Sequence, residues 1–291
     1  MTIKARLALG ILFTVSLPFA LAAADTKPAA APRLSAEQIV AKHIAARGGL
    51  QAWHTVQSMV WTGKMEAGVA DSAARSEAYV RNSFRRDAKA KRVALEAAAN
   101  KEPPKQVQLP FVLDIKRPEK SRVEIEFDGK TAVQVYDGTN GWKVRPFLNR
   151  RDVEPFTADE SKSQVGKWDL DGPLLDYAAQ GTKVALEGVE AVEGRNAYKL
   201  KLTTKDGVVQ HIWIDAQSFL DVKVEGTPRQ MDGRLHTVSI YQRDFRSVQG
   251  LLIPFVLETA VDGYPDTHKM LIEKVTVNPQ LDDALFAKPT A

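Results

Sequence analysis

The side chains that most often perform catalysis or bind metals are scattered along this chain. No two histidines stand at a close metal-ligand spacing; they are His43, His54, His211, His236 and His268. The chain contains no cysteine, so it has no thiolate nucleophile, thiolate metal ligand or disulfide. Ser218, Ser239 and Ser247 lie outside the Gly-x-Ser-x-Gly context of a serine hydrolase. We therefore expect no enzyme activity, no metal and no cofactor.

Acidic residues gather at Asp169, Asp171 and Asp176, where a carboxylate pair could act as general acid and base. The dipeptide Gly172-Pro173 between them is instead typical of a turn and a helix entry. No glycine-rich phosphate loop is present, and the net charge of +4 is too small to indicate nucleic-acid binding. The elements that surround these residues must therefore indicate the function.

The amino terminus has the pattern of a cleaved export signal over residues 1–24. Lys4 and Arg6 precede an apolar run from Leu7 to Leu21, and three small alanines follow. The alternative is a membrane anchor, but the run is shorter than the roughly 20 residues that span a bilayer. We expect an exported, soluble protein of the periplasm, with a flexible Ala- and Pro-rich leader at residues 25–33 and one domain over residues 34–291.

The segment before the first expected strand has the residue spacing of a helix. Apolar residues recur at this spacing between Leu34 and Trp53, Ser35 is a plausible N-cap, and Gln38 completes a capping box. Gly48-Gly49 ends the pattern. The sequence predicts an amphipathic helix that packs against a sheet or lies across its mouth.

Period-two alternation dominates the chain beyond Val107 and predicts a mainly β (α+β) fold. The apolar positions in three such sets are Val123, Ile125 and Phe127, then Leu200 and Leu202, then Leu220, Val222 and Val224. Turn signals separate the sets at Asp128-Gly129, Asp137-Gly138, Asn140-Gly141, Asp206-Gly207, Asp232-Gly233 and Asp262-Gly263. This spacing is that of an antiparallel meander with one polar face.

Several motifs occur in an order that resembles the LolA-like, outer-membrane lipoprotein-sorting carriers of Gram-negative bacteria. They are a helix ending in Gly-Gly-Leu, the strand Val60–Met65, the block Lys116-Arg117-Pro118, the hairpin Asp137–Trp142, the strand Gly250–Phe255 and the ending Leu281–Phe286. The resemblance implies a single antiparallel, strongly curved, unclosed β-barrel covered by lid helices. It also implies a non-enzymatic carrier or chaperone that holds acyl chains of a lipid or lipoprotein during transport towards the outer membrane.

Candidate site residues follow from this resemblance. The expected cavity lining is Trp61, Phe111, Val123, Ile125, Phe127, Trp142, Phe147, Trp213 and Phe255, for each of which ordinary core packing is the alternative. Arg117 and Arg122 are candidates for a latch that holds the lid shut by donating to backbone carbonyls, the alternative being strand-end surface charges.

A helix-prone, basic insertion over about residues 69–106 departs from the family pattern. Between Arg75 and Lys105 there are nine Lys and Arg against four acids. The predicted headgroup or partner surface comprises Arg81, Arg85, Arg86, Lys89, Lys91 and Arg92, and a solvated charged helix is the alternative. Expected partners are lipid or lipoprotein cargo and membrane-bound donor and acceptor proteins, with no nucleic acid and a monomeric state. The alternative function is a regulatory adaptor that senses lipid or lipoprotein and binds a membrane partner.

Overall fold

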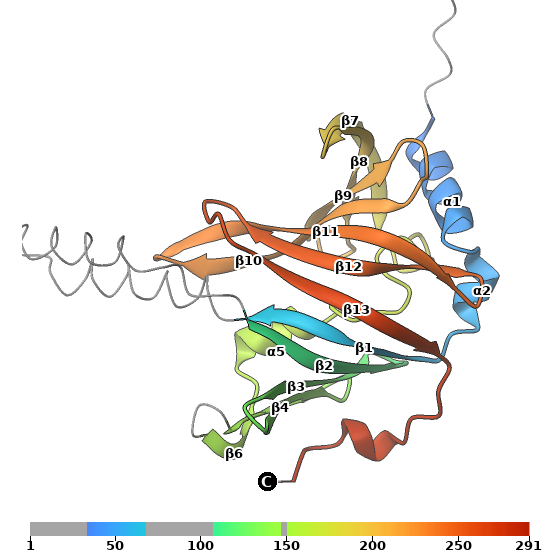
Figure 1. Cartoon of the computed structure of the whole chain (residues 1–291). Coiled ribbons are helices and arrows are strands. Elements are labelled where there is room, and N and C mark those ends of the chain that lie inside the picture. The colour runs from blue at the N-terminus through green and yellow to red at the C-terminus, as the bar shows by residue number, and fades with distance from the viewer. Residues whose placement is uncertain (1–33, 68–106, 147–149, 291) are drawn as a thin grey trace, which may run out of the picture. The chain divides into compact units, whose positions relative to one another are not determined.

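A single antiparallel sheet of thirteen strands runs through the described part of the chain (Figure 1). The computed structural model describes residues 34–67, 107–146 and 150–290, all within the second of two units, residues 34–291. The strands follow the order β6-β5-β4-β3-β2-β1-β13-β12-β11-β10-β9-β8-β7. No pairing joins β6 to β7 among these residues, so the sheet is open. The predicted mainly β, unclosed antiparallel fold is confirmed.

Two meanders meet where the first strand pairs with the last. The first comprises β1 Ser58–Ala67, β2 Val107–Lys116, β3 Lys120–Phe127, β4 Lys130–Tyr136, β5 Gly141–Arg145 and β6 Arg150–Pro155. The second comprises β7 Lys183–Val192, β8 Arg195–Thr203, β9 Val209–Asp215, β10 Asp221–Met231, β11 Arg234–Val248, β12 Leu251–Val261 and β13 Thr267–Val277. The helices are α1 Ala36–Ala46, α2 Leu50–His54, α5 Ala158–Gln164 and the 3₁₀ helix η2 Asp283–Phe286. None of the described helices is long and apolar enough to span a membrane.

The predicted N-terminal helix begins and ends where its sequence signals lie. The Ser35 hydroxyl accepts from the Gln38 amide at 3.2 Å, and the Gln38 side chain accepts from the Ser35 amide at 2.9 Å. After α1 the chain passes through Gly48 at φ 113°, and a Cβ there would lie 2.5 Å from the Gly250 carbonyl oxygen. Glycine is therefore required both by the backbone angle and by the close approach to the β11–β12 turn.

The strand register defines which side chains share a face, because directly opposed residues on antiparallel strands point the same way. Trp61 stands opposite Leu113 and Val275, and Leu113 stands opposite Val123. We call this side of the sheet the inner face and the other side the outer face.

Helices and one turn-rich segment cover the inner face. Ile39 and Val40 of α1 share a buried cluster with Leu200 of β8 and Ile212 of β9. Residues 166–182, here called the covering segment, contribute the buried side chains Leu170, Leu174 and Leu175. Most of this segment folds into consecutive turns, and the helix entry expected near Gly172-Pro173 does not lead into a helix.

One strand departs from the predicted alternation. Leu220, Val222 and Val224 were expected on one apolar face with Asp221 exposed, yet Asp221 is buried. A register shift in the β9–β10 pairing between Asp221 and Lys223 explains the difference. This irregularity turns Val222 toward the cluster around Trp213, while Val224 packs with the cluster under α1.

Candidate functional site

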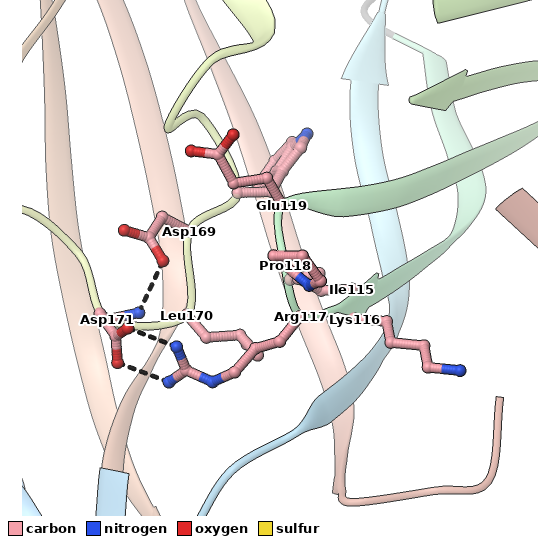
Figure 2. Close-up of a pocket in the computed structure, with 9 residues that line it drawn as sticks. Ile115, Lys116, Arg117, Pro118, Glu119, Asp169, Leu170 and Asp171 are labelled. Carbon is pink, nitrogen blue, oxygen red and sulfur yellow. Dashed lines mark hydrogen bonds and ion pairs between the residues drawn. The ribbon is translucent and has the colours of Figure 1, made fainter. Parts of the chain in front are cut away.

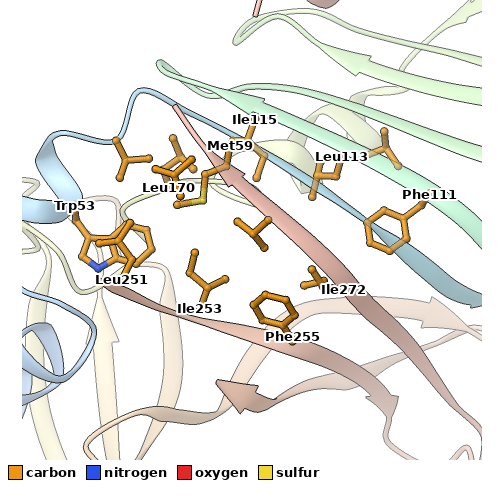
Figure 3. Packing of buried hydrophobic residues seen from close by; sticks show 14 of the residues in the cluster. Trp53, Met59, Phe111, Leu113, Ile115, Leu170, Leu251, Ile253, Phe255 and Ile272 are labelled. Carbon is orange, nitrogen blue, oxygen red and sulfur yellow. The ribbon is translucent and has the colours of Figure 1, made fainter. Parts of the chain in front are cut away.

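The largest buried cluster of the described residues lies between the inner face and its cover (Figure 3). We call this region the interior. The sheet supplies Met59, Phe111, Leu113, Ile115, Val123, Leu251, Ile253, Phe255, Ile272, Val275 and Val277. The cover supplies Trp53 of α2, Val56 just after that helix, and Leu170 and Leu175 of the covering segment. All buried members of the cluster are apolar, so the chemistry it offers is dispersion contact and exclusion of water.

Five of the predicted cavity residues come together in the interior. Phe111, Val123 and Phe255 are buried members of the cluster, and Trp61 and Ile125 pack against it. They come from β1, β2, β3 and β12, which the β1–β13 pairing brings into one sheet.

Phe127 and Phe147 are not part of this group. Phe127 is the last residue of β3, shares the parity of Val123 and Ile125, and is 42% exposed. It therefore lies at the rim of the sheet. Phe147 lies outside the described residues, as do residues 1–33 and the basic insertion with its six candidate side chains, Arg81, Arg85, Arg86, Lys89, Lys91 and Arg92.

Trp142 lies on the outer face. Its neighbour Lys143 stands opposite Gln134, and Gln134 stands opposite Val123, so Lys143 takes the inner parity. Trp142 itself stands opposite Val135.

Trp213 also lies on the outer face. Ile212 and Ile214 of the same strand pack with the cluster under α1, and Trp213 points the other way. Its indole N–H donates to Glu190 at 2.8 Å, and the Lys223 ammonium lies 4.0 Å from its ring centroid. Charged side chains thus shield this tryptophan from water.

Arg117 ties the turn between β2 and β3 to the cover (Figure 2). Both terminal nitrogens of its guanidinium donate to the carboxylate of Asp171 in the covering segment. Its Nε donates to the Val56 carbonyl at 2.6 Å, and Nη2 reaches the Trp53 carbonyl at 3.4 Å. The hydrogen bond to Asp171 raises the pKa of Arg117, so the group stays charged. We call Arg117, Asp171 and the two carbonyls the latch.

A second, more exposed contact joins α2 to the covering segment. The His54 ring lies 2.6 Å from the Asp176 carboxylate, with 40% and 41% of the two side chains exposed. Exposed pairs of this kind contribute little to stability. The latch is therefore the stronger of the two polar connections.

The acidic cluster has a role that local sequence did not reveal. Asp169 accepts from the Asp171 amide at 3.1 Å and so shapes the turn, as the sequence predicts, while burial raises the pKa of Asp169. Asp171 pairs with Arg117, which is 54 residues away in the chain.

Arg122 contacts a different part of the chain. It lies on the outer face, donates to Glu124 at 2.7 Å and reaches the Leu285 carbonyl of η2 at 3.3 Å. Phe286 of η2 is buried. Arg122 therefore holds the C-terminal segment and does not contact the cover.

A small pocket adjoins the latch (Figure 2). Its volume is about 220 Å³, and its lining includes Arg117, Glu119, Trp168, Asp169 and Leu170. Ligand sites in proteins usually enclose roughly 300–1,000 Å³. This pocket is therefore smaller than a typical ligand site.

Two indole N–H groups in the interior have no acceptor among the residues that the structure describes. They belong to Trp61 and Trp168. The two rings meet edge to face, with centroids 6.4 Å apart and planes at 81°. Trp61 is on β1 and Trp168 is in the covering segment, so the pair spans the boundary between sheet and cover.

Within residues 34–67, 107–146 and 150–290, no three His, Asp or Glu side chains form a cluster that could hold a metal ion.

Comparisons with known proteins give matches among solved structures alone. No protein-family model and no curated protein matches the chain. A LolA superfamily protein from Nitrosomonas europaea superposes with a TM-score of 0.51 at 15% identity, covering 88% of this chain and 99% of that one. A domain described as an outer membrane lipoprotein-sorting protein from Vibrio parahaemolyticus gives 0.50 at 11% identity, covering 86% and 95%. A DUF1329 family protein from Desulfovibrio piger gives 0.50 at 13% identity, covering 87% and 97%. The fold that the sequence motifs led us to expect is thus confirmed: this chain shares the fold of these solved structures, one of which is described as a LolA superfamily protein.

Proposed function

We propose that this protein is an exported, non-enzymatic carrier or chaperone of the periplasm. It binds the acyl chains of a lipid or lipoprotein in the interior and moves them towards the outer membrane. The observation that carries the proposal is the construction of the interior: an apolar sheet face whose cover is a set of separate segments, joined to it by side-chain packing and by a few polar contacts that include the latch and the Lys143–Glu160 ion pair.

The energetics of such a carrier follow from the hydrophobic effect. Burying one CH₂ group contributes about 0.8 kcal/mol, so an exposed acyl chain is strongly unfavourable in water. In the closed protein, Trp53, Leu170 and Leu175 occupy the space next to the sheet that acyl chains would fill. Cargo would replace the apolar contacts of the cover with apolar contacts of its own, so the free-energy difference between the closed and the loaded protein should be small. Modest differences in affinity between donor and acceptor would then drive both loading and release.

Opening is the step that the latch controls. The pocket of about 220 Å³ is too small for an acyl chain, and the cover is attached through turns and short helices that carry few backbone ladder bonds. Segments of this kind open at lower free energy than a paired sheet. Movement of the covering segment away from Arg117 would uncover the inner face while the strands stay paired.

The first test is mass spectrometry of protein purified natively from a periplasm, with extraction and identification of bound lipid. A stoichiometric acyl species supports the carrier. Protein that arrives empty, and that takes up neither added lipids nor added lipoproteins, contradicts the carrier and favours the regulatory adaptor.

A matched pair of variants tests whether the cargo binds at the inner face. Ile125→Lys puts a charge into the interior, whereas Glu126→Lys puts the same charge on an exposed neighbour that faces outward. We expect the first variant to lose at least about tenfold in affinity for a fluorescent fatty acid, because an ammonium cannot be buried cheaply. The second variant should bind like the unmodified protein. Equal binding by a correctly folded Ile125→Lys, checked by circular dichroism, would exclude this face.

A further inference from the structure

We infer that the interior recognises the carbonyl oxygen of an ester- or amide-linked acyl chain, through the indole N–H groups of Trp61 and Trp168. The inference rests on the proposed function and specifies which part of the cargo is bound. It adds a specific polar contact to the apolar side chains of the interior.

The positions of the two donors favour a shared ligand. Trp61 lies in the middle of β1, opposite Leu113 and Val275 of the inner face. Trp168 lies two residues before the buried Leu170 and lines the pocket beside the latch. One donor thus belongs to the sheet and the other to the cover. A carbonyl placed between them gains partners from both sides of the interior.

Two other tryptophans, Trp53 and Trp213, have paired indole groups. The Trp53 N–H donates to the Arg47 carbonyl at 3.1 Å, and the Trp213 N–H donates to Glu190 at 2.8 Å. Buried polar groups in proteins are nearly always hydrogen-bonded. Trp61 and Trp168 depart from that rule, and they do so side by side.

The chemistry of the donors selects the ligand. An indole N–H donates and cannot accept, so its partner must be an acceptor. Nearby side chains such as Leu113, Val275 and Leu170 have none. Glu119 and Asp169 line the same pocket as Trp168 and would repel a charged carboxylate, an effect that the Lys167 ammonium, 5.4 Å from the Trp168 ring centroid, offsets in part. An uncharged acyl carbonyl meets both requirements and is attached to the chain that the interior buries.

The experiment compares two lipids that differ in one carbonyl group. 1-Palmitoyl-lysophosphatidylcholine has an ester at the position where 1-O-hexadecyl-lysophosphatidylcholine has an ether, and an ether oxygen is the weaker acceptor. Affinities are measured by calorimetry below the micelle concentrations of both lipids. We expect the unmodified protein to bind the ester about tenfold more tightly, the factor that one net buried hydrogen bond contributes.

Substitution with phenylalanine removes the donor and keeps an aromatic ring in the core. We expect Trp61→Phe and Trp168→Phe each to reduce the ester-to-ether affinity ratio, and the double variant to bring it close to one with little change in ether affinity. Trp213→Phe is the control, because that indole lies on the outer face and is already paired. Its ratio should match that of the unmodified protein.

The possible results separate this inference from the proposed function. Equal affinity of the unmodified protein for both lipids overturns the carbonyl contact and leaves the carrier intact. An ester preference that survives the double substitution overturns the assignment to these two tryptophans. No binding of either lipid contradicts the carrier itself.

Discussion

Removal of the latch arginine should open the cover and leave the strands of the sheet paired. In Arg117→Ala the two donors to Asp171 are lost, together with the bond to the Val56 carbonyl. Hydrogen bonds to charged groups contribute about 1.5–3 kcal/mol, whereas exposed ion pairs contribute under about 1 kcal/mol. The Arg117 and Asp171 side chains are 26% and 17% exposed, between these two cases. We therefore assign about 2 kcal/mol to the latch, which corresponds to a roughly 30-fold larger open population.

Amide hydrogen exchange measures this population directly. The Thr182 amide donates to the Tyr177 carbonyl at 2.9 Å, and the Gln180 amide donates to the Asp176 carbonyl at 3.1 Å. Both bonds lie within the covering segment, so they report opening in which its turns unfold as it leaves the sheet. When reclosing is fast, the exchange rate is proportional to the open population. We expect these amides to exchange about 30-fold faster in Arg117→Ala, by the same conversion of about 2 kcal/mol. Amides in the β1–β13 pairing should keep their rates.

Arg122→Ala is the matched control for this measurement. It removes an arginine five positions along the chain whose bonds go to Glu124 and to the Leu285 carbonyl on the outer face. It should leave exchange in the covering segment unchanged. Two results would refute the reasoning: covering-segment rates in Arg117→Ala within about twofold of the unmodified protein, or equal acceleration in the segment and in the β1–β13 strands.

Two further predictions concern stability. Burial lowers the pKa of His43 below its ordinary 6.5, and the facing groups Asp221 and Arg47 shift that pKa in opposite directions. As the pH falls below 6.5, the unfolded chain therefore takes up a proton at His43 before the folded protein does. The His43 contribution to the unfolding free energy should be complete above pH 6.5 and should be lost as the pH falls below 6.5. Urea unfolding measured across this pH range should show the loss in the unmodified protein and not in His43→Gln. Parallel curves of unfolding free energy against pH for the two proteins would contradict this prediction. In Gly63→Ala the new Cβ would lie 2.0 Å from the Leu271 carbonyl oxygen, which forces the β1–β13 strands apart. We expect the substitution to lower the free energy of unfolding by about 2 kcal/mol or more and the melting temperature by about 5 °C. An unchanged melting temperature would show that the irregular β1–β13 pairing at Gly63 can accommodate the added Cβ without loss of stability.

Local signals predicted the elements of this fold well. The capping box of Ser35 and Gln38 marked the start of α1, because the donors and acceptors that satisfy a helix end lie within four residues. Asp128-Gly129 and Asp232-Gly233 marked hairpins, and both pairs adopt positive φ in the structure. These features need no information from distant parts of the chain.

Local sequence patterns could not predict which face of the sheet is covered or which distant segments contact each other. Alternation shows that Ile212 and Ile214 share one face and Trp213 the other, but it does not say which face is covered. Both faces carry apolar residues here, since charged neighbours shield Trp213. The register shift at Asp221 changes the parity of β10 without a clear sequence mark. The contact between Arg117 and Asp171 depends on a turn and a covering segment that meet only after the sheet has formed.

The pairing of β1 with β13 also has a consequence for how the chain folds. Ser58 and Asn278, which are 220 residues apart, are joined by a hydrogen bond at the end of this pairing. The interior needs side chains from both strands, so it cannot assemble until almost the whole chain is available. Contacts of such long sequence separation are slow to form, and until then β1 and β12 present unpaired edges to other chains. A chain of this topology that crosses a membrane unfolded would therefore depend on protection from aggregation until its last strand arrives.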